Sequence, residues 1–305
     1  MVTYYKIGDA FCASVHGNLP YEKTEKPAAG TKLTWLFTGD PGSRRASFLV
    51  DHPAELFAEK EDVSWLNTNR LDASAIDGQI GELPQEVMDQ IKTGTLRAVN
   101  ASHPKFKEIL AYEPKDGKKR VHVLAIGDVG SMLLTGLHLL GGDVISSIGI
   151  CDISDKVTAR WEFEENQIAY PWDYDAMPEV DVVAPEHLFD CDVFVFVASK
   201  GIPPVGSGVK DVRMYQFENN SKIIGHYAKM AREKNFKGLF CAVSDPVDPL
   251  AKTAFLESNK NEAGEYDWMG LLPEQIQGFG LGVMNARAAH YAKRDPRFKI
   301  GRAHV

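Results

Sequence analysis

A glycine-containing turn at residues 125–130 has the residue types that bind a phosphate group. Its sequence, A-I-G-D-V-G, follows the apolar run at 121–124 and precedes a helical pattern. The first N–H groups of a helix have no intrahelical acceptor, and together with the helix dipole they attract a pyrophosphate. Glycine also allows the backbone to approach a ligand closely. The turn therefore predicts phosphate contacts from Gly127, Val129 and Gly130, while an ordinary strand-to-helix turn is the alternative interpretation.

The turn differs from the usual G-x-G-x-x-G fingerprint at two positions, but a second signal accompanies it. Ala125 stands in place of the first glycine, and Asp128 puts a carboxylate inside the turn, where its charge repels phosphate unless it faces solvent. The second signal is Asp152, which ends the next strand-like run. A carboxylate there accepts hydrogen bonds from both ribose hydroxyls and repels a 2′-phosphate. Asp152 therefore favours NAD over NADP, and its alternative role is a charge at a helix N-terminus.

These residues need a scaffold of alternating strands and helices, and the sequence after Arg120 has this pattern. Its strand-like runs are short, apolar and rich in β-branched or aromatic residues, which suits parallel strands buried on both faces. The runs lie at 121–126, 145–153, 191–199 and 237–244, and helical patterns include those at 154–168 and 211–234. The alternation predicts an α/β fold with a doubly wound, Rossmann-type parallel sheet.

The first 118 residues lack this alternation. Strand-like runs at 32–37 and 46–50 are separated by T-G-D-P-G-S-R-R, which indicates a hairpin or a longer connection. We place a boundary in the polar, turn-rich segment 113–120. The expected organisation is a separate α+β domain of unknown role at 1–118, an NAD-binding Rossmann domain at 119–260, and the start of a truncated substrate domain at 261–305.

Composition argues against several classes of function. The chain of 305 residues carries a formal net charge of −8, so it lacks the basic excess of a general nucleic-acid binder. It contains no apolar run of the length that spans a membrane, and its start lacks a signal-peptide pattern, so we expect a cytoplasmic protein. The four cysteines are far apart, and no H-E-x-x-H motif is present, so we expect no metal site.

From about residue 121 onward, an ordered set of motifs resembles the L-lactate/malate dehydrogenase family. After the turn and Asp152 come V-F-V-F-V-A-S-K-G-I-P-P, then V-K-D-V-R-M-Y-Q-F-E-N-N-S-K-I-I, C-A-V-S-D-P-V-D-P-L and G-F-G-L-G-V-M-N-A-R-A-A-H-Y-A-K-R. The resemblance implies an NAD-dependent enzyme that transfers a hydride to or from a small 2-hydroxy or 2-oxo acid. It also implies a homo-oligomer, and it places Ala198 and Ser199 in the loop that lies over the cofactor.

The resemblance assigns roles to further residues. Arg213 falls where a mobile-loop arginine polarises the substrate carbonyl, and Arg287 falls where an arginine binds the substrate carboxylate. Asn220 falls where an asparagine contacts the nicotinamide side of the site. A helix-surface arginine is the alternative for Arg213, and an ordinary solvent-facing residue is the alternative for Asn220.

Three departures from the family pattern keep a second hypothesis open. Asp245 replaces an asparagine before Pro-Val-Asp in the substrate site, and Met284 replaces the aspartate three residues before Arg287. The family's proton-transferring histidine falls beyond Val305, so we expect the sequence to be a portion of a longer enzyme. The alternative to a dehydrogenase is a nucleotide-binding regulatory module that kept the fold without the chemistry.

Overall fold

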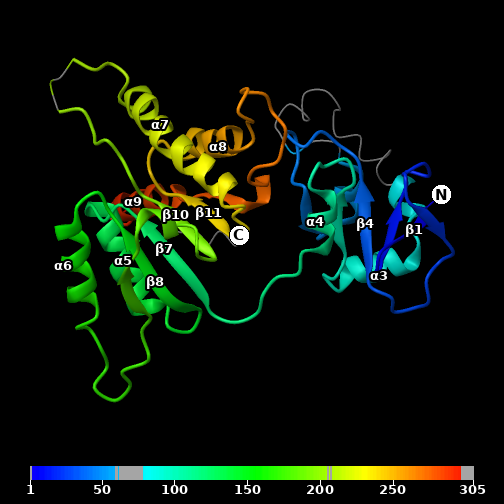
Figure 1. Cartoon of the computed structure of the whole chain (residues 1–305), viewed down its shortest axis with the longest axis horizontal. Coiled ribbons are helices and arrows are strands. Elements are labelled where there is room, and N and C mark those ends of the chain that lie inside the picture. The colour runs from blue at the N-terminus through cyan, green and yellow to red at the C-terminus, as the bar shows by residue number, and fades with distance from the viewer. Residues whose placement is uncertain (1, 59–60, 62–77, 205, 207, 297–305) are drawn as a thin grey trace. The chain divides into compact units, whose positions relative to one another are not determined.

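The computed structural model describes residues 2–58, 61, 78–204, 206 and 208–296. The chain forms two compact units (Figure 1). Unit 1 comprises Met1–Asp116 and Asn259–Glu274, and unit 2 comprises Gly117–Ser258 and Gln275–Val305. The chain therefore passes between the units three times, after residues 116, 258 and 274.

Unit 2 contains a sheet of six parallel strands. The strands are β7 (Lys119–Leu124), β8 (Ile145–Cys151), β9 (Glu179–Val182), β10 (Val193–Phe196), β11 (Leu239–Ala242) and β12 (Ile276–Gly278). Their order is β12-β11-β10-β7-β8-β9, and every neighbouring pair is parallel. The strand order reverses between β7 and β10, because β7 leads to β8 on one side and β10 leads to β11 on the other. The predicted doubly wound Rossmann-type sheet is confirmed.

Helices connect these strands. They are α5 (Asp128–Leu140), α6 (Asp155–Glu165), α7 (Val212–Glu233) and α8 (Val247–Ser258), with α9 (Leu281–Ala292) after the last strand and the short 3₁₀ segments η2 (Pro185–His187) and η3 (Pro273–Gln275). Right-handed crossovers place α5 and α6 on one face of the sheet and α7 and α8 on the other. Figure 1 shows α7 and α8 side by side. Between the layers lies a core of aliphatic side chains that includes Val123, Leu134, Ile148 and Ile150.

Unit 1 has a mixed six-stranded sheet of its own. The strands are β1 (Thr3–Ile7), β2 (Ala10–Ser14), β3 (Glu22–Thr24), β4 (Leu33–Phe37), β5 (Ser47–Leu49) and β6 (Arg97–Asn100), in the order β3-β1-β2-β4-β6-β5. The β2–β4 and β4–β6 pairs are parallel and the others are antiparallel. Since β6 lies between β4 and β5, the predicted runs at 32–37 and 46–50 are joined by a longer connection and not by a hairpin. The N-terminal region thus contains the expected sheet, with η1 (Pro53–Phe57), α3 (Gln85–Lys92) and α4 (Phe106–Ala111).

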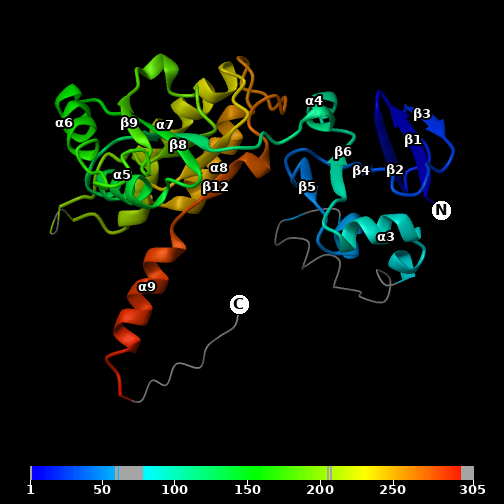
Figure 2. The same cartoon turned by 90° about the horizontal axis from the view of Figure 1, so that it is seen from below.

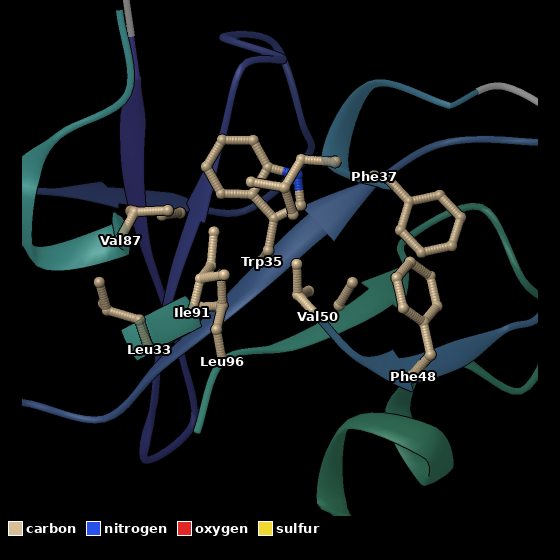
Figure 3. Close-up of a cluster of buried hydrophobic side chains, with 11 residues drawn as sticks. Leu33, Trp35, Phe37, Phe48, Val50, Val87, Ile91 and Leu96 are labelled. Carbon is tan, nitrogen blue, oxygen red and sulfur yellow. The ribbon is translucent and has the colours of Figure 1, made fainter. Parts of the chain in front are cut away.

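The core of unit 1 is built around β4, whose five residues are all buried. Trp35 at its centre is 0% exposed and lies among side chains from β4, β5 and α3 and from the loops beside β5 and β6 (Figure 3). Its indole N–H has no hydrogen-bond partner among the described residues. The packing of this cluster is therefore almost wholly apolar.

Residues 259–274, which precede β12 in the sequence, complete unit 1. The Glu274 carboxylate accepts hydrogen bonds from the backbone N–H groups of Ala46 (3.0 Å) and Ser47 (2.7 Å). The buried ammonium of Lys105 donates to the carbonyl oxygen of Gly270 (3.0 Å). A Cβ atom at Gly42 would lie 2.6 Å from the indole of Trp268, so a larger residue there would require the indole to shift.

The predicted range 261–305 is distributed over several parts of the fold. Its residues up to Glu274 lie in unit 1, β12 extends the sheet of unit 2, and α9 follows. The end of the range, 297–305, lies outside the described residues. The existence of a separate substrate domain stays a prediction.

Candidate dinucleotide-binding site

The turn between β7 and α5 exposes a helix N-terminus. Helix α5 begins at Asp128, and its N-cap residue Gly127 provides no side-chain acceptor for the first N–H groups. Gly127, Asp128 and Val129 are all exposed, and a Cβ atom added to Gly127 would meet no other atom within 4 Å. The open approach and the unsatisfied donors are the two properties that an anion site at a helix N-terminus requires.

Gly130 is required by the packing of this turn. A Cβ atom at this position would lie 2.0 Å from the carbonyl oxygen of Ala125, which is backbone and has no room to move. The same atom would lie 3.8 Å from a methyl group of Val197, beyond the end of β10. The last glycine of the sequence pattern therefore holds the start of α5 close to the strand ends.

Ala125 adopts the conformation that the missing first glycine would favour. Its φ angle is 74°, in the left-handed region that costs an ordinary L-residue about 1–2 kcal/mol. Its N–H donates to the carbonyl oxygen of Cys151 at the end of β8 (2.8 Å). The turn thus keeps its shape without the first glycine, at the expense of backbone strain.

Asp152 braces the same turn from the end of β8. One carboxylate oxygen accepts a hydrogen bond from the N–H of Ile126 (2.8 Å), and the other accepts from the N–H of Ser154 (3.0 Å). Each carboxylate oxygen has a further lone pair, so the side chain can also accept from the two hydroxyls of a ribose. Ile153, Ser154 and Asp155, which follow directly, carry no positive charge, and the first cation after Asp152 in the sequence is Lys156. These donors and acceptors fit the adenosine half of NAD.

A neighbouring thiol is kept neutral. Burial, and after it the charges of Asp152 and Glu186, raises the pKa of Cys151 above its usual value. A neutral buried thiol is a poor nucleophile and a poor metal ligand. Among the described residues no group of three histidine, cysteine or acidic side chains could hold a metal ion. Within the same part of the chain, no helix has the length and apolarity needed to cross a membrane.

The loop after β10 meets the turn where the strand order reverses. Ala198 is half-buried and Ser199 is exposed, and the Ser244 hydroxyl, which follows β11, donates to the carbonyl oxygen of Ala198 (2.6 Å). Ligands of open α/β sheets bind at such a reversal, outside the carboxyl ends of the strands. The structure therefore brings the predicted residues of the turn, Asp152, Ala198 and Ser199 to one edge of the sheet.

Asn220 lies under this loop and is 0% exposed. Its side-chain oxygen accepts from the N–H of Lys200, and its amide nitrogen donates to the Ser199 hydroxyl and to the carbonyl oxygen of Asp245. The alternative of an ordinary solvent-facing helix residue does not hold. Neither the contacts of Asn220 nor the role of Ser244 was foreseeable from the sequence motifs.

The residues predicted to bind substrate are less organised. Arg213 lies in the first turn of α7, Arg287 lies on α9, and both are exposed without an ion pair to any described residue. None of the side chains of α9 is buried, and the helix projects from the rest of unit 2 (Figure 2). Asp245 is exposed, with its carbonyl held by Asn220. The cofactor half of the predicted site is therefore assembled, while no described contact joins the two arginines to it.

Comparison with known proteins agrees with the sequence motifs. No family model matches the chain. An L-lactate dehydrogenase of Mycoplasma mobile is 28% identical over 134 residues, which cover 43% of this chain and 39% of that protein. The resemblance to lactate and malate dehydrogenases is thereby supported. The chain spans about two fifths of the length of this curated relative.

Solved structures of the same kinds of enzyme are also similar to the chain. A ligand-bound minor L-lactate dehydrogenase of Enterococcus mundtii has 18% identity and a TM-score of 0.40, over 48% of this chain and 44% of its own. A malate dehydrogenase of Archaeoglobus fulgidus in complex with NADH has 19% identity and a TM-score of 0.43, and the match covers 56% of this chain and 53% of the other.

Proposed function

We propose that unit 2 binds NAD at the carboxyl edge of its parallel sheet and takes part in hydride transfer to or from a small 2-hydroxy or 2-oxo acid. The observation that supports this most directly is the pairing of the Gly127–Gly130 helix N-terminus with the Asp152 carboxylate. The first offers donors to the pyrophosphate, and the second offers acceptors to the adenosine ribose. The similarity to an L-lactate dehydrogenase supports the class of reaction.

In this proposal the chain's own residues bind and orient the reactants. NAD, when bound, supplies the hydride acceptor. The Arg287 guanidinium binds the substrate carboxylate through two parallel hydrogen bonds, and Arg213 donates to the substrate oxygen and stabilises its developing negative charge. His122 and His138 of unit 2 are not assigned to proton transfer, because both are buried and hydrogen-bonded to backbone carbonyls. A homo-oligomeric state and a cytoplasmic location belong to the same proposal.

Titration of the chain with NADH and with NADPH tests cofactor binding. We expect NADH to bind more tightly than NADPH, and we expect Gly130→Ala to weaken NADH binding by at least about tenfold, because the overlap with Ala125 displaces the turn. Gly136→Ala is the matched control on the same helix, since its Cβ meets no atom within 4 Å. Equal NADH affinity of the wild type and Gly130→Ala would count against this site.

The substrate half is tested by Arg287→Lys. Lysine keeps the charge but lacks the planar fork, so pyruvate or oxaloacetate should bind more weakly to the NADH complex of the variant. NADH affinity should stay unchanged, because Arg287 is assigned no contact with the cofactor. Unchanged binding of both 2-oxo acids would remove Arg287 from the proposed site.

A non-catalytic nucleotide-binding module is the second candidate function. The exposure of Arg287 and Met284 on α9, which has no buried side chain, favours it. NADH binding without any oxidation of NADH in the presence of pyruvate, oxaloacetate or other small 2-oxo acids would select this candidate over the dehydrogenase.

A further inference from the structure

One buried side chain joins the ends of two strands at the proposed cofactor edge. The side-chain oxygen of Asn220 accepts a hydrogen bond from the N–H of Lys200 (2.9 Å), two residues beyond Ala198. Its amide nitrogen donates to the carbonyl oxygen of Asp245 after β11 (2.9 Å) and to the hydroxyl of Ser199 (3.2 Å). A single residue of α7 thus holds the loop after β10 and the loop after β11.

The partners of Asn220 settle which way its amide points. The N–H of Lys200 is a donor, so it requires the side-chain oxygen, and the carbonyl of Asp245 is an acceptor, so it requires the nitrogen. Both amide hydrogens and the oxygen therefore have protein partners. Since the side chain is fully buried, it has no exposed surface to offer a ligand in this arrangement.

The helix under the two loops is firmly packed. Beyond Asn220, the same helix buries Ile224, Gly225 and Ala228. Helix α7 also packs along α8. A second hydroxyl supports the same loops, because Ser244 donates to the carbonyl oxygens of Val197 (3.2 Å) and Ala198 (2.6 Å). The loops are held by side chain–backbone hydrogen bonds in a region where regular strand pairing has ended.

We infer that Asn220 is a positioning residue, which holds the loops at Ser199–Lys200 and at Asp245 in the arrangement that receives the cofactor, and does not itself contact the cofactor. The inference rests on the proposed NAD site. A preorganised loop raises affinity because binding then requires no ordering of the chain. Loss of the buried amide leaves two backbone groups and one hydroxyl without their partner, so the loops gain mobility.

Two variants of Asn220 and one neighbour separate positioning from contact. Asn220→Ala removes all three hydrogen bonds, whereas Asn220→Asp has almost the same shape, keeps an acceptor for Lys200 and loses both donations. Asn219→Ala is the matched control, because among the described residues the Asn219 amide donates to the carbonyl oxygen of Tyr215 within the same helix and to no other group. The measurements are hydrogen–deuterium exchange at the Lys200 amide, the dissociation constant for NADH, and the unfolding midpoint of each variant.

We expect Asn220→Ala to speed exchange at Lys200 and to weaken NADH binding, each by about tenfold, which corresponds to the loss of a net hydrogen bond or two. Asn220→Asp should retain slow exchange at Lys200 while still binding NADH more weakly, since the tie to Asp245 is lost. Asn219→Ala should change neither quantity. All affinities are compared at temperatures well below the unfolding midpoints.

The remaining outcomes overturn the inference in distinguishable ways. Weaker NADH binding by Asn220→Ala with unchanged exchange at Lys200 means that Asn220 contacts the cofactor directly. Faster exchange with wild-type NADH affinity means that the two loops do not serve the cofactor, while the proposed function stands. A wild-type chain that does not bind NADH overturns the proposed function and, with it, the inference. If Asn220→Ala does not fold, Asn220→Ser is measured in its place, because its shorter side chain cannot keep the three hydrogen bonds to Lys200, Ser199 and Asp245 together.

Discussion

The two units each contain a six-stranded sheet, but the sheets differ in strand direction and in the parts of the chain that build them. In unit 2 all neighbouring strands are parallel, five of the six come from one continuous stretch, and helices cover the connections. Unit 1 has a mixed sheet, and residues 259–274, far away in the sequence, complete it. The carboxylate of Glu274 and the ring of Trp268 make contacts there that residues 1–116 alone do not provide.

The two sheets are therefore sensitive to different kinds of substitution. The site of unit 2 depends on local backbone geometry within the turn at 125–130. The stability of unit 1 depends on long-range contacts, in its core around Trp35 and at the docked segment 259–274. Changes to the two units should therefore have different consequences for folding and for NADH binding.

The largest effect is expected from Trp35→Ala. The residue is fully buried within the apolar cluster of unit 1 that Figure 3 shows, so the free energy of unfolding of this unit should fall by about 3–5 kcal/mol. Hydrogen exchange should accelerate in β4 and β6 but not in β7 and β8. Trp35→Phe is the milder control, since it also removes the unpartnered indole N–H. Equal acceleration in β7 and β8 would show that the units unfold together.

Acidification should destabilise unit 1 through His103. Burial, and after it the charge of Lys105, lowers the pKa of this histidine from 6.5 to about 4. The neutral form is favoured in the folded state, so its stability contribution is fully present above pH 6.5 and is lost as the pH falls toward 4. At about 1.4 kcal/mol per pKa unit, the loss over this window is on the order of 3 kcal/mol. Urea unfolding of His103→Asn should show a shallower loss of stability between pH 7 and pH 4.5 than the wild type, and an equally steep loss would contradict this assignment.

Glu274→Ala should weaken the attachment of residues 259–274 to the rest of unit 1. The N–H groups of the buried Ala46 and the half-buried Ser47 lose their acceptor, at a cost of about 1–3 kcal/mol. Exchange at these two amides should accelerate, whereas Glu274→Gln, which keeps one acceptor oxygen, should have a smaller effect. NADH affinity should be unchanged, and a loss of NADH binding would show that unit 1 influences the site of unit 2.

The smallest effect is expected from Ala125→Gly. Glycine relieves the left-handed strain at φ 74° but gains entropy in the unfolded chain, so unit 2 should be stabilised by about 1 kcal/mol or less. Thermal unfolding measures the change, and NADH affinity should remain within about twofold, since Ala125 already has a positive φ angle that glycine adopts freely and the turn need not move. A destabilised variant would mean that the Ala125 methyl group contributes packing that outweighs the strain.

Much of unit 2 was predictable because its signals are local. The predicted strand runs at 145–153, 191–199 and 237–244 contain β8, β10 and β11, and the run at 121–126 overlaps β7, which begins two residues earlier. The predicted helices contain α6 and α7. Short apolar runs and helical periodicity arise from neighbouring residues, so no tertiary information was needed. The strands β9 and β12 gave no clear signal, because the four residues of β9 (E-V-D-V) include two acids and the three of β12 (I-Q-G) include one apolar side chain, so neither forms an apolar run.

The candidate site was predictable only in part. Gly130 and Asp152 follow from motif spacing, because the close approach of backbone and the position at a strand end impose their residue types. Ser244 and the partners of Asn220 do not follow, since their hydrogen bonds join residues 20 to 46 positions apart in the chain. Whether Arg213 and Arg287 bind a substrate stays a prediction.

Three features follow from the amino-acid sequence without a fold: the alternation of strands and helices after Arg120, the glycine that the turn at 125–130 requires, and the acid at the end of the second strand. Periodicity and the absence of a Cβ atom act over a few residues, so they can be read without a fold. Only the tertiary structure decided that residues 259–274 belong to unit 1 and that Asn220 holds two strand ends together. Both depend on hydrogen bonds between side chains and distant backbone groups, which exist only once the chain has folded.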